Sequence, residues 1–508
     1  MVVVQKREVD QEGQNLVELY QRKFKHKHRP KRKMSNVLKI ANDYSFFLSD
    51  NPTIRHELWD RLRFREKNYF HNRAFKMRKW DGYINFFALD TGKFLTGLLP
   101  EVCAVLKSKN IEYTIEDTRP TSPFQTEPID DQFLNSWLPE DQSPISLYDY
   151  QVEFINKVVK HRRGVIFAPT SAGKTNIMIG ILKALPPNIP TLVLQNRVTL
   201  AQQNYEEIKK WGFDNVGCLW GKNVSPNVIT VASVQSVAKI EKLLPKIRVL
   251  IVDEIHDMMS ALPKSVYRRM KAADVRIAVS ATPFKFGGTD SVQKFSVRGF
   301  FGPILKIESA EKGILTTAEL QKRGILAASH CTFYPIREPA IPHDIYIDAV
   351  TRGIAESYYF HKVVTRLAKG QKGRTLILVD RIAHGDALHS LLPGSLWVQG
   401  KDDLKTRKGV IKQLQKESGD IIAIATQQIF NTGVNVFVHN LINAAGGQAD
   451  HLIIQRMGRG LRTADDKTRL NYYDFVFEIN DYLEGHSEKR IKILTEEGHE
   501  VVRKEIDF

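Results

Sequence analysis

The sequence is poor in cysteine and lacks any long apolar run, and both absences restrict its class. Its 508 residues include only three cysteines, Cys103, Cys218 and Cys331, far apart in the chain. Their spacing gives neither a disulfide framework nor a metal-binding motif, which suits a reducing cytoplasm. There is no stretch of about 18 apolar residues, and the start MVVVQKREVDQEG becomes charged too early for a secretory signal. We therefore expect a cytoplasmic protein without a membrane partner.

Acidic residues are too few to balance the basic ones. The chain has 74 Lys and Arg against 57 Asp and Glu, a net charge of +17 and a pI near 9.5. This excess favours a polyanionic partner such as nucleic acid, because Lys and Arg release counterions when they bind phosphate. A merely solubilising charge is the alternative. The segment 22–33 holds eight Lys or Arg, and we expect it to be a disordered arm.

Composition and hydrophobic pattern divide the chain into six regions. We expect a basic tail (1–35), a small α+β domain that binds DNA (36–117) and a linker rich in Pro, Thr and Asp (118–139). These are followed by a first α/β domain (140–328), a second α/β domain (329–480) and a C-terminal tail (481–508).

The two large regions have the pattern of parallel sheets. Short β-branched runs alternate with amphipathic helices, which indicates an α/β fold with helices on both sheet faces. The expected strands are Val165–Ala168, Thr191–Gln195, Val228–Ala232, Val249–Val252, Arg276–Ser280, Thr375–Val379, Ile421–Thr426 and His439–Ala444. In the small domain we expect a turn at Trp80–Gly82, a helix over 100–107 and a strand over 111–115.

The segment APTSAGKT follows the first expected strand and resembles a phosphate-binding loop. It matches G-x-x-x-x-G-K-[ST], except that Ala168 replaces the first glycine. Backbone N–H groups of such a loop, and of the helix expected over 176–185, face an anion. Lys174 would neutralise the β- and γ-phosphates, and Thr175 would coordinate Mg²⁺. The predicted nucleotide-binding residues are Pro169, Thr170, Ser171, Ala172, Gly173, Lys174 and Thr175.

A pair of carboxylates follows another expected strand. The run Val249–Val252 is apolar and is followed directly by Asp253 and Glu254. Asp253 would hold Mg²⁺ through its water shell, and Glu254 would align or deprotonate an attacking water. An acidic turn that caps a helix is the alternative. With the upstream loop, the pair predicts ATP hydrolysis.

These motifs together resemble a superfamily 2 helicase. The further matching segments, in the family's order, are Tyr148–Gln151, DEIH at Asp253–His256, SATP at Ser280–Pro283, FNTGVN at Phe430–Asn435 and QRMGRGLR at Gln455–Arg462. The resemblance implies two RecA-like domains, with ATP and Mg²⁺ bound between them.

The resemblance also implies roles for these residues. Arg459 and Arg462 would act as arginine fingers on the γ-phosphate. Tyr148, Gln151, Gly433, Asn435 and Gln455 would bind the nucleotide, with Gln151 reading adenine and Asn435 contacting the sugar. His256, Ser280 and Thr282 would couple hydrolysis to movement. The expected nucleic-acid track comprises Arg197 (with the segment from Gln195), Gln202, Ser233, Gln235, Arg381, His384, Gly400 and Arg407. Each of these could equally be a helix cap or a surface group.

Four segments resemble the UvsW-type branch-migration helicases of bacteriophages more specifically. They are PTSAGKT, the stretches VDRIAHGDAL and VQGKDDLKTR, and FKMRKWDGYI at 75–84. The last implies that Lys76, Arg78, Lys79 and Trp80 form a basic, aromatic-flanked strand that grips duplex phosphates. A hairpin turn with a core tryptophan is the alternative.

The resemblance implies a DNA-stimulated ATPase with 3′-to-5′ polarity. Its expected substrates are forks, Holliday junctions and D-loops, with RNA–DNA hybrids as a further partner, in replication, recombination and repair. The alternatives are an RNA-directed DExH helicase, a nucleic-acid-binding scaffold that does not hydrolyse ATP, and the motor subunit of a larger restriction or remodelling machine.

Overall fold

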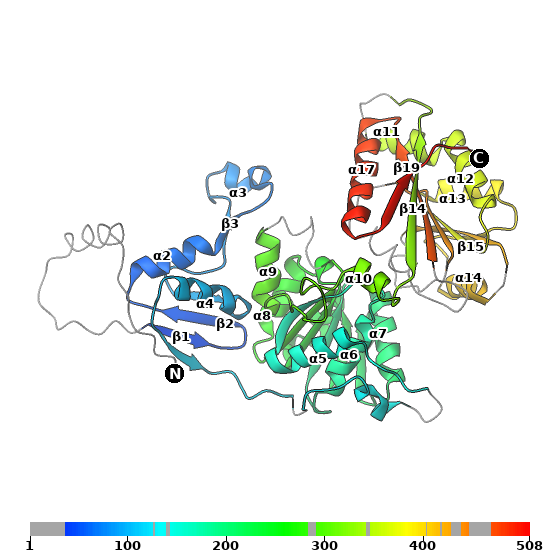
Figure 1. Cartoon of the computed structure of the whole chain (residues 1–508). Coiled ribbons are helices and arrows are strands. Elements are labelled where there is room, and N and C mark those ends of the chain that lie inside the picture. The colour runs from blue at the N-terminus through cyan, green and yellow to red at the C-terminus, as the bar shows by residue number, and fades with distance from the viewer. Residues whose placement is uncertain are drawn as a thin grey trace, which may run out of the picture.

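The computed structural model describes most of the chain. The described residues are 36–124, 127–138, 143–282, 291–341, 346–402, 404–416, 419–427, 438–446 and 469–507. Figure 1 shows a small N-terminal part, a central α/β domain (domain 1) and a second α/β domain (domain 2). The expected basic tail and the predicted site residues Gly433, Asn435, Gln455, Arg459 and Arg462 lie outside the described residues.

The N-terminal domain is a four-stranded sheet with two helices packed on it. The sheet order is β5-β2-β1-β6, and Leu38, Phe47 and Phe94 are buried in its core. A ribbon of β3 and β4, with α3 between them, projects away from this sheet (Figure 1). The elements are β1 (Val37–Ile40), β2 (Tyr44–Leu48), α2 (Pro52–Arg61), β3 (Arg63–Arg65), η1 (Tyr69–His71), α3 (Arg73–Lys76), β4 (Tyr83–Asn85), β5 (Lys93–Leu95), η2 (Thr96–Leu98), α4 (Leu99–Ser108) and β6 (Thr114–Asp117).

Domain 1 is built on a seven-stranded sheet of order β10-β9-β11-β8-β12-β13-β7, parallel except for β10. Alternate residues of the strands pack on opposite faces, against α5 to α7 on one face and η4, α8 and α9 on the other. The elements are α5 (Asp149–His161), β7 (Arg163–Phe167), α6 (Lys174–Lys183), β8 (Thr191–Gln195), α7 (Val198–Lys210), β9 (Val216–Trp220), β10 (Asn223–Ser225), β11 (Ile229–Ser233), η4 (Val234–Lys246), β12 (Val249–Asp253), η5 (Ile255–Asp257), α8 (Ala261–Arg269), β13 (Val275–Ser280) and α9 (Ser291–Phe301).

Domain 2 repeats the layered arrangement, with α10 (Thr317–Lys322) between the two domains. Its sheet has the order β16-β17-β15-β18-β19-β14-β20 and is parallel throughout. The elements are β14 (Ala328–Ile336), α11 (Tyr346–Val350), η7 (Thr351–Ala355), α12 (Tyr358–Lys369), β15 (Arg374–Val379), α13 (Ile382–Leu391), β16 (Leu396–Val398), α14 (Leu404–Lys416), β17 (Ile421–Thr426), β18 (Asn440–Asn443), β19 (Arg469–Phe477), α17 (Asp481–Glu496) and β20 (Glu500–Arg503).

The expected C-terminal tail is wrong, because residues 481–507 complete domain 2. Helix α17 packs on β19, and β20 pairs with β14 at the edge of the sheet. Arg490 of α17 forms a buried ion pair with Asp474 of β19, with 2.9 Å between Nη2 and Oδ1. The buried side of α17 includes Ser487 and Arg490 beside two leucines. Because these polar residues occupy buried positions, the sequence of α17 does not show the apolar periodicity by which a packed helix is recognised.

The expected linker is also packed rather than free. Phe124, Ile129 and Leu134 are buried in the core of domain 1, and residues 133–137 form the short helix η3. The backbone N–H of Ile129 donates to Asn156 Oδ1 at 2.8 Å, and Asn156 Nδ2 donates back to the carbonyl of Ile129 at 2.9 Å. This segment is therefore packed against α5 of domain 1.

The N-terminal domain is docked on α9 of domain 1. The rings of Phe64 and Phe295 lie 4.2 Å apart, and Asn42 Nδ2 donates to the carbonyl of Ala272 at 3.3 Å. The backbone at Gly97 lies so close to α9 that a Cβ there would overlap the carbonyl oxygen of Arg298. The two domains therefore share one packed interface.

Substitution of Gly97 tests this interface. Gly97→Ala places a methyl group against the backbone of α9, so we expect a loss of about 1–3 kcal/mol of stability, as for overpacking elsewhere. Thermal unfolding followed by circular dichroism measures the change. Gly485→Ala is the control, because a Cβ on that exposed helical glycine meets nothing within 4 Å. Equal midpoints for both variants would contradict the close packing.

Candidate functional site

Parallel pairing brings three predicted motifs to one edge of the domain 1 sheet. Strands β7, β13 and β12 are neighbours, with Phe167 opposite Ser280 and Val279 opposite Asp253. The carboxyl ends of these strands therefore lie side by side. The phosphate loop, the SAT segment and the acidic pair each begin at one of these ends, as expected for a ligand site of a parallel sheet.

The loop between β7 and α6 has the backbone conformation of an anion cradle. Ser171 and Gly173 have positive φ angles of 67° and 74°, and α6 begins at Lys174. The first N–H groups of a helix have no partner within the helix, and the dipole at this end of α6 favours an anion. Lys174 Nζ lies 3.4 Å from the carbonyl oxygens of Ala168 and Pro169, so the ammonium sits at the loop.

Gln151 connects the start of α5 to this loop. Its Oε1 accepts from the backbone N–H of Tyr148 at 3.0 Å, and its Nε2 donates to the carbonyl of Ala172 at 3.1 Å. Gln151 is buried, whereas Tyr148 is 45% exposed and stacks on Tyr150 with 5.5 Å between ring centroids. Both predicted nucleotide-binding residues thus lie near the loop, Tyr148 partly exposed and Gln151 with its amide already bonded.

Asp253 ends β12 in a polar cluster. Its Oδ2 accepts from Gln195 Nε2 at 3.2 Å and from Asn204 Nδ2 at 3.5 Å. Burial raises the pKa of Asp253, the Glu254 charge adds to this rise, and Lys174 opposes it. The segment from Gln195 was expected on the nucleic-acid track, but Gln195 is fully buried and faces Asp253 instead. Gln195 and Asn204 therefore support the acidic site, and no sequence motif marked Asn204.

The DEIH and SAT segments are joined by side-chain hydrogen bonds. Ser280 Oγ lies 3.0 Å from His256 Nδ1 and donates to Glu254 Oε2 at 3.3 Å. The backbone N–H of Thr282 donates to Ser280 Oγ at 3.1 Å. Glu254 itself has a left-handed backbone, with φ of 52°. A displacement of the SAT segment would therefore move the partners of Glu254, which is the connection that the coupling role needs.

The oxygen donors at this edge are of the kind that Mg²⁺ takes. Thr175 lies in the first turn of α6, which follows β7, and Asp253 ends β12, which is two strands from β7 in the sheet. A hydroxyl and a carboxylate are hard ligands, which suit a Mg²⁺ ion that keeps several waters and binds phosphate oxygens. Thr170 Oγ1 is a further buried oxygen of the loop.

Two residues predicted on the nucleic-acid track do not reach the surface. Ser233 is fully buried, and its hydroxyl donates to Ser236 at 3.2 Å. His384 is 1% exposed and stacks on His361 with 4.9 Å between centroids, and burial lowers its pKa to about 3. As DNA contacts these two predictions are wrong, because both side chains are buried.

The remaining track residues lie at the surface or close to it. Gln235 is exposed, and its Nε2 donates to the carbonyl of Asn196 at 2.9 Å. Arg381 Nη1 donates to Thr351 Oγ1 at 2.5 Å, and Arg407 donates to the carbonyl of Gly400. Arg197 is the N-cap residue of α7, and Gln202 is partly buried on the same helix.

The basic segment of the N-terminal domain is a helix and a turn, not the expected strand. Lys76 ends α3, and Arg78 has a positive φ of 55°. Trp80 is partly buried, and its Nε1 donates to the carbonyl of Tyr83 at 2.7 Å. A hollow of about 600 Å³ opens here, lined by Phe70, Phe75, Lys76, Arg78, Lys79, Trp80 and Asp81. Positive charge and aromatic rings therefore meet at one surface.

Comparisons with known proteins agree with this geometry. A family model described as "Type III restriction enzyme, res subunit" matches residues 144–285. The chain is 25% identical over 366 residues to the "DNA 3'-5' translocase XPB2" of Sulfurisphaera tokodaii, covering 64% of this chain and 81% of the relative. It is 23% identical over 463 residues to the "ATP-dependent DNA helicase uvsW" of Enterobacteria phage T4, covering 83% and 86%.

A solved structure supports the fold. An HsdR subunit fragment of a type I restriction enzyme from Vibrio vulnificus YJ016 aligns with a TM-score of 0.54 and 18% identity, covering 83% of this chain and 75% of that one. In its fold and in the arrangement of its site, the chain is similar to the ATP-dependent enzymes of helicase superfamily 2. Within that class the chain is similar to UvsW. No helix of the described residues is long and apolar enough to cross a membrane.

Substitution of Gly173 tests the loop geometry. A Cβ at this position would overlap Gln151 Nε2, and the positive φ disfavours any side chain. We therefore expect Gly173→Ala to weaken nucleotide binding about tenfold or more, since left-handed strain alone costs about 1–3 kcal/mol. Titration with a fluorescent ATP analogue measures the affinity. Gly409→Ala, where a Cβ meets nothing, should bind as the unaltered protein does; equal affinities for the two variants would be inconsistent with this loop.

Proposed function

We propose that the chain is a DNA-stimulated ATPase that moves 3′ to 5′ along one strand and remodels branched DNA. Holliday junctions, forks and D-loops are the proposed substrates, with RNA–DNA hybrids as a further one. Replication, recombination and repair are the corresponding roles, and the host cytoplasm is the place where a phage enzyme of this kind acts. A superfamily 2 DNA helicase or translocase is the coarser class that the relatives share.

The observation that carries the proposal is the shared edge of the sheet. There, Lys174 lies at the loop, Asp253 ends β12 and is followed by Glu254, and Ser280 connects Glu254 to His256. Lys174 would neutralise phosphate charge, Asp253 and Thr175 would hold Mg²⁺, and Glu254 would orient the attacking water. Mg²⁺, when bound, supplies further positive charge to the transferred phosphate.

Arginine fingers are part of the proposal. Arg459 and Arg462, with Gln455, Gly433 and Asn435, belong to segments outside the described residues, so their roles rest on the motif alone. In the sequence these segments lie between strands of domain 2, so DNA-driven closure of the two domains would complete the site. Hydrolysis would then reopen the domains and advance the motor.

The hollow beside Trp80 supports a grip on DNA by the N-terminal domain. Lys76, Arg78 and Lys79 are exposed around it and can contact phosphates, and Phe70 is half exposed. Because this domain is docked on α9, duplex held there would stay fixed relative to domain 1 while the motor pulls one strand. That arrangement suits the remodelling of a junction.

A motor subunit of a larger restriction or remodelling machine is the second candidate. The family model whose description names a restriction enzyme matches residues 144–285, within the region 140–328 expected for the first α/β domain, and the HsdR fragment shares the fold. Both matches concern the motor, so they favour the ATPase without selecting the machine. DNA cleavage by the purified chain would favour this candidate over branch migration.

The loss of the loop lysine tests ATP hydrolysis. Lys174→Ala removes the cation that faces the phosphates, so we expect the ATPase rate to fall about a hundredfold or more, as for other lost charge-stabilising donors. Binding of a labelled fork should persist. A rate close to that of the unaltered protein would refute the assignment, and a joint loss of binding and of the folded circular-dichroism signal would mark the lysine as structural.

A single lysine tests the N-terminal grip. Lys79→Ala should weaken binding to a fork and reduce the slope of log affinity against log salt by about 1, the effect of one lost phosphate contact. Lys107→Ala is the matched control, because Lys107 is an exposed lysine on α4 of the same domain. Fluorescence anisotropy at several salt concentrations measures both slopes. Identical slopes would place the DNA elsewhere.

A matched substrate panel tests the branched-DNA role. ATPase rate and strand displacement are measured on single strand, blunt duplex, fork, four-way junction and RNA–DNA hybrid of equal length. We expect forks and four-way junctions to be processed fastest. Strong stimulation by RNA, with junctions ignored, would select the RNA-directed alternative, and DNA binding without any hydrolysis would select the scaffold.

A further inference from the structure

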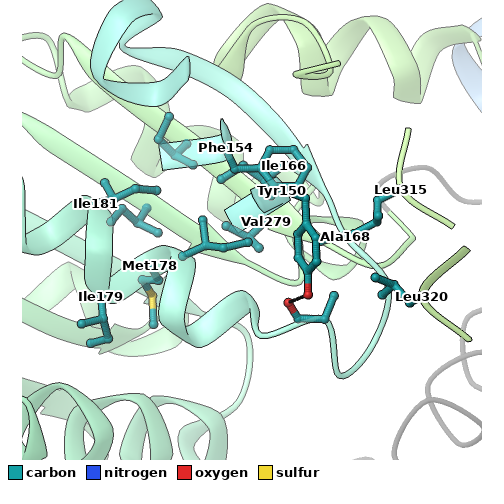
Figure 2. Close-up of a cluster of buried hydrophobic side chains, with 14 of the residues drawn as sticks. Tyr150, Phe154, Ile166, Ala168, Met178, Ile179, Ile181, Val279, Leu315 and Leu320 are labelled. Carbon is teal, nitrogen blue, oxygen red and sulfur yellow. Dashed lines mark hydrogen bonds between the residues drawn. The ribbon is translucent and has the colours of Figure 1, made fainter. Parts of the chain in front are cut away.

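One peptide group of the phosphate loop is held by two side chains of α5. The carbonyl oxygen of Ala172 accepts from the Tyr150 hydroxyl at 3.1 Å and from Gln151 Nε2 at 3.1 Å. Figure 2 shows the Tyr150 ring buried near Ala168, with its hydroxyl bond drawn as a dashed line. Two donors use both lone pairs of this oxygen and fix the plane of the peptide.

Fixing that peptide also fixes a donor for the phosphate. A trans peptide places the N–H of Gly173 opposite the carbonyl of Ala172. With the carbonyl turned toward Tyr150 and Gln151, the N–H is aimed at the other side of the loop. Tyr150 therefore acts on the anion cradle without touching the anion. Sequence reasoning assigned roles to Tyr148 and Gln151 but none to Tyr150.

Arg323 places the segment after α10 against the same tyrosine. Its guanidinium lies 5.5 Å from the centroid of the Tyr150 ring, and it forms an ion pair with Asp149. Leu315 and Leu320 of the connecting segment are buried in the same apolar cluster as Tyr150 and are drawn beside it in Figure 2. The connector between the two domains is thus fixed to the residue that orients the loop.

The same connector also contacts domain 2. Thr317 Oγ1 of α10 donates to Glu497 Oε2 at 3.2 Å. The turn after α17 approaches α10 so closely that a Cβ at Gly498 would overlap the Ala318 side chain. The C-terminal end of α10 therefore lies against Tyr150, and its first turn lies against domain 2.

We propose that Tyr150 and Arg323 are positioning residues that link the phosphate loop to the connector α10. Tyr150 holds the Ala172–Gly173 peptide in its phosphate-binding orientation, and Arg323 holds α10 against Tyr150. Movement of domain 2 then reaches the loop through α10 and Arg323, and occupancy of the loop reaches domain 2 by the same route. This inference rests on the proposed ATPase function.

Nucleotide affinity and DNA stimulation test the link. Tyr150→Phe keeps the ring and leaves Gln151 on the Ala172 carbonyl, so the loss of one hydrogen bond should weaken binding of a fluorescent ADP analogue about two- to tenfold. Arg323→Ala should weaken it to a similar extent and should also reduce the ratio of DNA-stimulated to unstimulated kcat. Arg323→Lys keeps a cation above the ring and should restore most of both.

The control and the double variant separate this link from general damage. Lys322→Ala removes an exposed cation from the same turn and should leave affinity and stimulation unchanged. The Tyr150→Phe and Arg323→Ala effects on affinity should be less than additive in the double variant, because both act through the orientation of the Ala172–Gly173 peptide. Strictly additive effects, or an Arg323→Ala variant identical to Lys322→Ala, would overturn the proposal. A wild-type chain that binds no nucleotide would instead overturn the ATPase assignment itself.

Discussion

The parallel pairing of β7, β13 and β12 is the constraint on which the rest of the site depends. Since their carboxyl ends lie at one edge, three segments from distant parts of the chain meet there without a dedicated loop framework. Parallel strands require helical crossovers, so both faces of the sheet are covered and its strands are buried. The parallel pairing that buries the core thus also brings together the phosphate loop, the acidic pair and Ser280.

A buried cation, Arg163, connects the N-terminal domain to the sheet of domain 1. Arg163 of β7 donates to the carbonyl of Asn42 in the N-terminal domain and to those of Phe300 and Ala273 in domain 1. Burial lowers its pKa well below the usual value. A buried guanidinium is costly unless its donors are bonded, so separation of the two domains would leave this charge poorly paired. The contacts of Arg163 therefore disfavour separation of the two domains.

Much of this was predictable from the sequence, and the failures have physical reasons. Thr191–Gln195 and Ile421–Thr426 were predicted with their observed bounds, because a run buried on both faces is continuously apolar. Helix α17 was missed because Ser487 and Arg490 occupy its buried side. The motif positions gave the loop and the acidic pair, whereas the burial of His384 depends on the packing of α12 against α13, which no local pattern contains.

A single hydroxyl joins the acidic pair to the end of β13. Ser280 Oγ has one proton, and it contacts both Glu254 and His256 while accepting from the Thr282 N–H. Any rearrangement of Glu254 during hydrolysis must therefore be shared with the end of β13. The next described element along the chain is α9, which carries the docked N-terminal domain through Phe295 and Arg298. Hydrolysis and the proposed duplex grip are thus connected through consecutive elements of domain 1, independently of the connector to domain 2.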